Sequence, residues 1–143
     1  MTEITFHFNV PDRTTSACRL LRKASRSGAR VSVPAGADVL DELDRALWAF
    51  DPIEFVPHVR LAATESPSAR LAPTPIWLVE DASDAPHHEV LVNLGDTSPP
   101  GFESYARLIE IVSTADEDRA AARLRWRRYA DRGYPIERHE VAA

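Results

Sequence analysis

The chain alternates apolar and polar side chains most clearly near its N-terminus. Every second residue from 4 to 10 is apolar, which is the period that a half-buried strand requires. Between residues 39 and 50, apolar side chains recur every three or four positions, the spacing of one helix face. The two patterns predict a strand over residues 4–10 and a helix over residues 38–50. The apolar positions of the helix are Val39, Leu40, Leu43, Ala46, Leu47 and Phe50.

Turn residues and compact apolar runs divide the rest of the chain. The first helix is predicted to begin at a cap formed by Thr14, Thr15 or Ser16 and to end before Gly28. Asp38 is predicted to cap the second helix. The remaining expected elements are strands at 30–33, 76–79, 89–94 and 108–112, an extended piece at 55–58, an exposed loop at 61–75, one or two helical turns at 102–106, a helix at about 116–132 and an edge strand at 135–141.

Short strands and helices in alternation are typical of an α/β domain with a parallel sheet. A chain of 143 residues is long enough to bury one core. We therefore expect a single three-layer domain over residues 1–143, with a mostly parallel central sheet flanked by helices. This architecture is Rossmann-like without a phosphate loop, because residues 36–38, after the second strand, fit neither GxGxxG nor GxxxxGK[ST].

The charge and cysteine content narrow the function classes. A net charge of −5 argues against general adhesion to DNA or to an anionic membrane. The single cysteine, Cys18, excludes an internal disulfide and any multi-cysteine metal site. The chain also has no long apolar run and no signal-peptide layout, so we expect a cytoplasmic protein.

No catalytic constellation is recognisable in the sequence. His87 and His88 are adjacent, so on an extended backbone they point in opposite directions and do not clamp one metal ion. The loop from Asn93 to Thr97 follows a predicted strand, where α/β active sites lie, but a lone Gly-Asp there is more often a turn. We expect no metal, no cofactor and no enzyme activity. A nucleotide-binding enzyme that uses this loop remains the alternative.

One candidate contact surface spans residues 46–58. If Leu43, Leu47 and Phe50 face the core, Trp48 points to another side of the same helix. The segment then carries more large apolar side chains than one core-facing stripe needs. Either Trp48 and Phe55 wrap the end of the sheet, or they form a hydrophobic docking patch for a partner subunit.

The second candidate surface is the predicted helix at 116–132. On a helical wheel Arg119, Arg123 and Arg127 share one narrow sector, and Trp126 borders it. The cations either pair with the nearby acidic residues Asp116, Glu117, Asp118 and Asp131, or meet an anionic partner. In the second case Arg123 and Arg127 grip a carboxylate or phosphate, and Trp126 walls the pocket. Direct binding of single-stranded nucleic acid is a further alternative, disfavoured by the acidic remainder of the chain.

Several motifs resemble the chi subunit family of bacterial DNA polymerase III, and together they cover nearly the full length. The most specific part combines Leu47-Trp48 with Phe55-Val56-Pro57-His58. The other matching stretches are Phe6, residues 26–31 (Arg-Ser-Gly-Ala-Arg-Val), Leu43-Asp44, the pattern Arg123-x-Arg125-Trp126-Arg127-x-Tyr129, and Gly133-Tyr134.

The resemblance implies a non-catalytic accessory protein of the clamp-loader assembly that binds two partners. The psi subunit would contact Trp48, Phe55, Val56 and Pro57. The acidic C-terminal tail of single-stranded-DNA-binding protein, which ends in an apolar aromatic residue with a free carboxylate, would occupy a site formed by Val112, Arg123, Trp126 and Arg127. Family members often have tyrosine where this chain has Trp126 and lysine where it has Arg127, so both an aromatic wall and a cation are kept.

Overall fold

The computed structural model describes residues 1–50, 56–61, 70, 71 and 73–140. Within them the strands are β1 (Glu3–Val10), β2 (Val31–Pro34), β3 (His58–Leu61), β4 (Ile76–Val79), β5 (Val90–Asn93), β6 (Arg107–Ser113) and β7 (Ile136–Glu140). The helices are α1 (Arg13–Ser27), α2 (Ala37–Phe50) and α3 (Asp116–Asp131), with short 3₁₀ turns η1 (Ala82–Asp84) and η2 (Phe102–Ser104).

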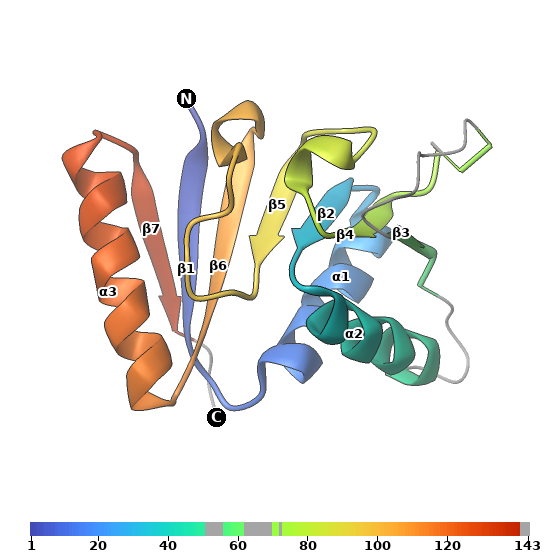
Figure 1. Ribbon diagram of the computed structural model, residues 1–143, viewed down its shortest axis with the longest axis horizontal. Helices are drawn as coiled ribbons and strands as arrows, with labels where there is room; N and C mark the ends of the chain where they lie inside the picture. Colours follow the sequence, from blue (N-terminus) through green and yellow to red (C-terminus); the bar gives the residue numbers. More distant parts are fainter. Residues whose placement is uncertain (51–55, 62–69, 72, 141–143) are drawn as a thin grey trace.

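The strands form one sheet in the order β3-β4-β2-β5-β6-β1-β7, shown in Figure 1. Each neighbouring pair is parallel. The predicted three-layer α/β domain is therefore confirmed, and within the described residues the sheet is wholly rather than mostly parallel. The strand predicted at 135–141 is β7, and it lies at an edge as expected.

The sheet buries apolar clusters on both of its faces. On β6, Ile109 and Ile111 belong to the cluster that includes residues of α1 and α2. Leu108 and Val112 belong to the cluster that includes residues of α3. The period of two along β6 thus separates the layers, with α1 and α2 on one face and α3 on the other.

Two helix starts differ from the predictions. Asp12 caps α1, because its extended backbone lets Oδ1 accept a hydrogen bond from the Thr14 amide at 3.0 Å. Thr15 donates its hydroxyl to the same carboxylate instead of capping the helix itself. Helix α2 begins at Ala37, so Asp38 lies in its first turn and is not its cap. Gly28 ends α1 as predicted, with a positive φ of 79°.

The segment after α2 is only partly described. Strand β3 covers His58–Leu61, so it begins at the last residue of the predicted extended piece and includes Leu61, the first residue of the predicted loop. Phe55 and most of that loop lie outside the described residues. Across the described part of the chain, no helix combines the length and apolar character needed to cross a membrane.

Candidate functional site: a basic groove between α3 and β7

Helix α3 presents two different sets of side chains. Ala122, Arg125 and Tyr129 are buried against the sheet. Arg119, Arg123 and Arg127 are exposed and recur every four residues, so they form a row along another side of the helix. The sequence grouped these three arginines correctly, but it gave Arg125 no role of its own.

The buried side of α3 is tied to β6 through Glu110, which has no solvent exposure. Glu110 Oε2 accepts a hydrogen bond from Arg125 Nε at 3.2 Å and one from the Tyr129 hydroxyl at 2.6 Å. Oε1 accepts one from Asn93 Nδ2 at 2.6 Å. Burial raises the pKa of Glu110, and the Arg125 charge and the three donors oppose that shift. Burial and the Glu110 charge raise the pKa of Tyr129. This network fixes the rotation of α3 about its axis.

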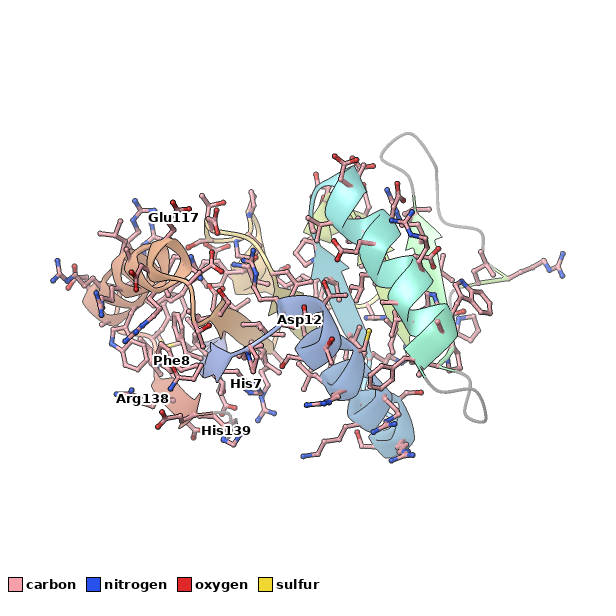
Figure 2. The ribbon with its side chains drawn as sticks, turned by 90° about the horizontal axis from the view of Figure 1, so that it is seen from below. His7, Phe8, Asp12, Glu117, Arg138 and His139 are labelled. Carbon is pink, nitrogen blue, oxygen red and sulfur yellow. The ribbon has the colours of Figure 1, made fainter. Side chains whose placement is uncertain are left out.

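The exposed arginine row forms one side of a groove of about 530 Å³, which we call the α3–β7 groove. The opposite side comes from the ends of β1 and β7. Figure 2 labels Phe8 and Arg138, which lie next to each other beneath α3 in that view. The lining residues are Phe8, Asn9, Arg119, Ala122, Arg123, Trp126, Arg127, Arg138 and Glu140.

The floor of the groove is aromatic. The Trp126 ring lies 5.0 Å from the Phe6 ring and 6.1 Å from the Phe8 ring, measured between centroids. Phe6 and Phe8 stack at 5.7 Å, and Phe6 is fully buried. Trp126 and Phe8 are half-buried, so each offers part of its ring to a ligand.

The electrostatic balance of the groove is strongly positive. Among the described residues, four arginine side chains line it, against one carboxylate, that of Glu140. Within the described part of the chain, no ion pair joins Arg119, Arg123 or Arg127 to a carboxylate. The pairing with acidic residues of the same helix, which the sequence left open, is therefore absent among these residues. The groove fits an anionic ligand that also carries an apolar group.

One acidic residue at the start of α3, Asp118, contacts groups outside the groove. Asp118 lies 3.6 Å from Arg13 Nε and accepts a hydrogen bond from Ser113. Arg13 also donates to the Leu94 carbonyl at 2.7 Å. Asp118 therefore holds the start of α3 against α1 and the loop after β5, and it does not neutralise the arginine row.

The predicted tail-binding residues are only partly brought together. Arg123, Trp126 and Arg127 line the groove side by side. Val112 is buried near the end of β6 and packs in the core behind Trp126, so it does not line the groove. Its predicted role in tail binding stays a prediction.

Sequence reasoning missed Phe8 and Arg138 as lining residues. The alternation along β1 did place Phe8 on the face of Phe6, which was the available signal. For Arg138 there was no signal, because its position depends on β7 pairing with β1, which precedes it by more than a hundred residues.

The predicted psi-binding residues differ in exposure. Trp48 is 60% exposed on α2, and its ring lies 5.2 Å from the His58 ring. Val56 is 1% exposed and belongs to the core, whereas Pro57 is half-buried. Phe55 lies outside the described residues. Of the three residues of the set that the structure describes, Trp48 is the one with a large exposed apolar surface.

His58 fixes the chain after this region. Its Nδ1 lies 2.7 Å from the Val56 carbonyl oxygen, and its Nε2 lies 2.8 Å from Asp44 Oδ1. The ring therefore connects the start of β3 to α2. The His58 ring, held by these two contacts, lies beside the Trp48 ring.

The loop that follows β5 uses its polar groups internally. Asn93 Nδ2 donates to the Thr97 carbonyl at 2.9 Å as well as to Glu110, and Asn93 Oδ1 accepts from the Gly95 amide at 2.9 Å. Arg125 donates to the Asp96 carbonyl at 2.6 Å. These bonds hold the loop against β6 and α3.

The other residues considered for chemistry are Cys18, His87 and His88. Cys18 is buried, and burial raises the pKa of its thiol to about 11. His87 is nearly buried, and His88 stacks on Tyr105 at 4.4 Å. Among the described residues, no group of three or more histidine, cysteine, aspartate or glutamate side chains is arranged to hold a metal ion.

Comparison with known proteins gives a consistent result. The family model described as "DNA polymerase III chi subunit, HolC" matches residues 1–137. The "DNA polymerase III subunit chi" of Pseudomonas aeruginosa is 33% identical over 130 residues, which covers 90% of this chain and 87% of that protein. The protein of the same name from Haemophilus influenzae is 30% identical over 129 residues, which covers 87% of this chain and 85% of that protein.

Proposed function

This chain belongs to the family of DNA polymerase III chi subunits, and we propose that within that assembly it is an adaptor for single-stranded-DNA-binding protein. The family membership gives it an accessory role in DNA replication. The proposed ligand is the acidic C-terminal tail of single-stranded-DNA-binding protein, bound in the α3–β7 groove. Arg123 and Arg127 hold its carboxylates, and Trp126 contacts its terminal aromatic ring.

The observation that carries this proposal is the combination of arginines and exposed aromatic surface in one groove. The guanidinium groups of Arg123 and Arg127 have no carboxylate partner among the described residues, and Trp126 lies between them along the helix. A peptide end supplies both missing partners, because a terminal carboxylate accepts hydrogen bonds from arginine and an aromatic side chain stacks on tryptophan. The acidic net charge of the chain then matters little, because the ligand is the protein tail and not the DNA.

The test is a fluorescence-anisotropy titration of a labelled synthetic tail peptide with the full chain. Hydrogen bonds to charged groups are worth about 1.5–3 kcal/mol, so Arg123→Ala and Arg127→Ala should each weaken binding about tenfold or more. Arg128→Ala is the matched control, because Arg128 is exposed on the same helix but does not line the groove. It should leave the affinity unchanged.

Two further controls address the ligand chemistry. A peptide with an amidated C-terminus should bind less tightly, and added salt should weaken binding of the free-acid peptide, because the contact is partly ionic. The site assignment is wrong if Arg123→Ala and Arg127→Ala bind the peptide as tightly as Arg128→Ala does.

We propose a second contact, with the psi subunit, on the surface around Trp48. The observation that favours it is the 60% exposure of this large apolar side chain beside His58. Trp48→Ala should abolish co-purification with psi while changing the melting temperature little, since the exposed ring is not part of the core. Retained co-purification would refute this assignment, and tail-peptide binding should be unaffected in either case.

The remaining alternatives predict different ligands for the same protein. A direct nucleic-acid binder should shift a single-stranded oligonucleotide with no partner present. A nucleotide-binding enzyme should gain thermal stability from added nucleotide. We expect neither effect at moderate salt.

A further inference from the structure

The side of the α3–β7 groove opposite the helix carries charged residues of its own. Arg138 and Glu140 alternate with Glu137 and His139 along β7, so they lie on the face that α3 covers. Both Arg138 and Glu140 line the groove, and both are exposed. They have opposite charges, so the two should act on an anionic ligand in opposite senses.

Arg138 is positioned by an aromatic contact. It pairs in register with Phe6, yet its guanidinium carbon lies over the Phe8 ring, 5.0 Å from the centroid. The side chain therefore leans along the strand into the groove. Among the described residues no carboxylate pairs with it, so its N–H groups remain available to a ligand.

Glu140 is positioned by a hydrogen bond from β1. The Asn9 side-chain amide donates to Glu140 Oε1 at 2.5 Å. Asn9 has a positive φ of 59°, a conformation that asparagine tolerates better than most residues, and it lies where the β1–β6 register shifts. This irregularity presents the amide to β7 and keeps one negative charge at that end of the groove.

The topology shows which helix residues face these two charges. Strands β6 and β7 are both parallel to β1, so α3, which connects them, runs back from the carboxyl ends of the strands to their amino ends. Arg119 therefore lies toward the end that holds Asn9 and Glu140. Arg127 lies about 12 Å further along the helix axis, toward the amino ends of the strands.

We propose that β7 forms a second recognition wall of the groove, in which Arg138 attracts the acidic ligand and Glu140 sets its position. This inference rests on the proposed tail-binding function. Arg138 and the arginine row of α3 line the groove from opposite sides, so the negative part of the peptide binds between them. Glu140 disfavours negative charge at the Arg119 end, and that end accommodates an uncharged part of the peptide.

Two charge variants on β7 test this proposal in the same anisotropy titration. Arg138→Ala should weaken binding of the acidic peptide about fivefold or more, because a charge-assisted contact is lost. Glu140→Gln should strengthen binding by about 1.5- to fivefold, because a like charge is removed from a partly exposed site. A gain in affinity is informative, because a variant with a damaged fold does not bind better.

The matched control is Glu137→Gln on the same strand. Glu137 is exposed, but it lies on the opposite face of β7, so removal of its charge should leave the affinity unchanged. A peptide with its acidic side chains replaced by the matching amides supplies the second control. Arg138→Ala should then have a much smaller effect, because the charges that it attracts are gone.

The outcomes separate this inference from the tail-binding proposal. If Arg127→Ala weakens binding but Arg138→Ala and Glu140→Gln do not change it, the second wall is refuted and the tail site stands. If Glu140→Gln strengthens binding no more than Glu137→Gln does, Glu140 has no role in positioning the ligand. If the peptide fails to bind the unmodified chain, both proposals fall together.

Discussion

Replacing Arg125 by methionine should destabilise the fold far more than replacing any exposed arginine of α3. Arg125 is 3% exposed and contacts Glu110, which is 0% exposed. The substitution keeps the aliphatic volume but removes the cation, along with the hydrogen bonds to Glu110 at 3.2 Å and to the Asp96 carbonyl at 2.6 Å. It leaves a buried carboxylate without its counter-charge.

Breaking a buried ion pair in this way costs about 3–5 kcal/mol. We expect the lower end of that range, about 3 kcal/mol, because Tyr129 and Asn93 still donate to Glu110. The unfolding entropy of a 143-residue chain is about 0.3 kcal/mol per kelvin near 60 °C, so the melting temperature should fall by about 10 °C.

The assay is thermal unfolding followed by circular dichroism, with Arg128→Met as the control. Arg128 is exposed on the same helix, so its replacement should change the free energy of unfolding by no more than about 0.5 kcal/mol. Adding Glu110→Gln to the Arg125→Met variant should recover about 1 kcal/mol, because the unpaired buried charge is then removed. Equal melting temperatures for Arg125→Met and Arg128→Met would refute the claim that this network anchors α3.

Further predictions concern single groups of the fold. Burial raises the pKa of Glu110 above its ordinary value of 4.5. The proton-linked part of its contribution to stability is therefore complete below pH 4.5 and is lost as the pH rises through the higher folded-state pKa. The free energy of unfolding relative to Glu110→Gln should fall with rising pH, and a flat or rising difference would contradict this. Gly28→Ala should cost about 1 kcal/mol, because Gly28 has a positive φ of 79°, whereas Gly36→Ala should cost less, and equal costs would argue against backbone strain. Because burial raises the pKa of Cys18 to about 11, only about one thiol in a thousand is ionised at pH 8, so a thiol reagent should label the unfolded chain quickly and the folded chain hardly at all.

The elements were predictable where local pattern decides them. The alternation at 4–10 and the apolar runs at 76–79 and 108–112 correspond to β1, β4 and β6, because a strand buried in a sheet needs those side chains whatever its neighbours are. The parallel sheet followed from the order of strands and helices. The cap of α1 was wrong, since several neighbouring residues can accept the same hydrogen bond and only the backbone angles select Asp12.

The candidate site was predictable only on its helical side. A wheel places Arg119, Arg123 and Arg127 together because their spacing is local. The strand side depends on the pairing of β7 with β1. The spacing of apolar and polar residues along the chain does not predict which strands become neighbours. Glu110 did carry an overlooked signal, because a lone carboxylate in an apolar strand needs a buried partner, and Arg125 is that partner.

Helix α3 combines an anchor to the sheet with the proposed binding surface. Its buried residues are Ala122, Arg125 and Tyr129, so apolar burial alone does not hold it on the sheet. The hydrogen bonds of Arg125 and Tyr129 to Glu110 supply the rest. Residues 125 and 127 therefore respond differently to the same kind of substitution. Loss of Arg127 should weaken the tail peptide at constant melting temperature, whereas loss of Arg125 should lower the melting temperature and weaken the peptide only as far as α3 shifts. Measuring the melting temperature and the peptide affinity of the Arg125 and Arg127 variants distinguishes a residue that binds the ligand from a residue that holds α3 in place.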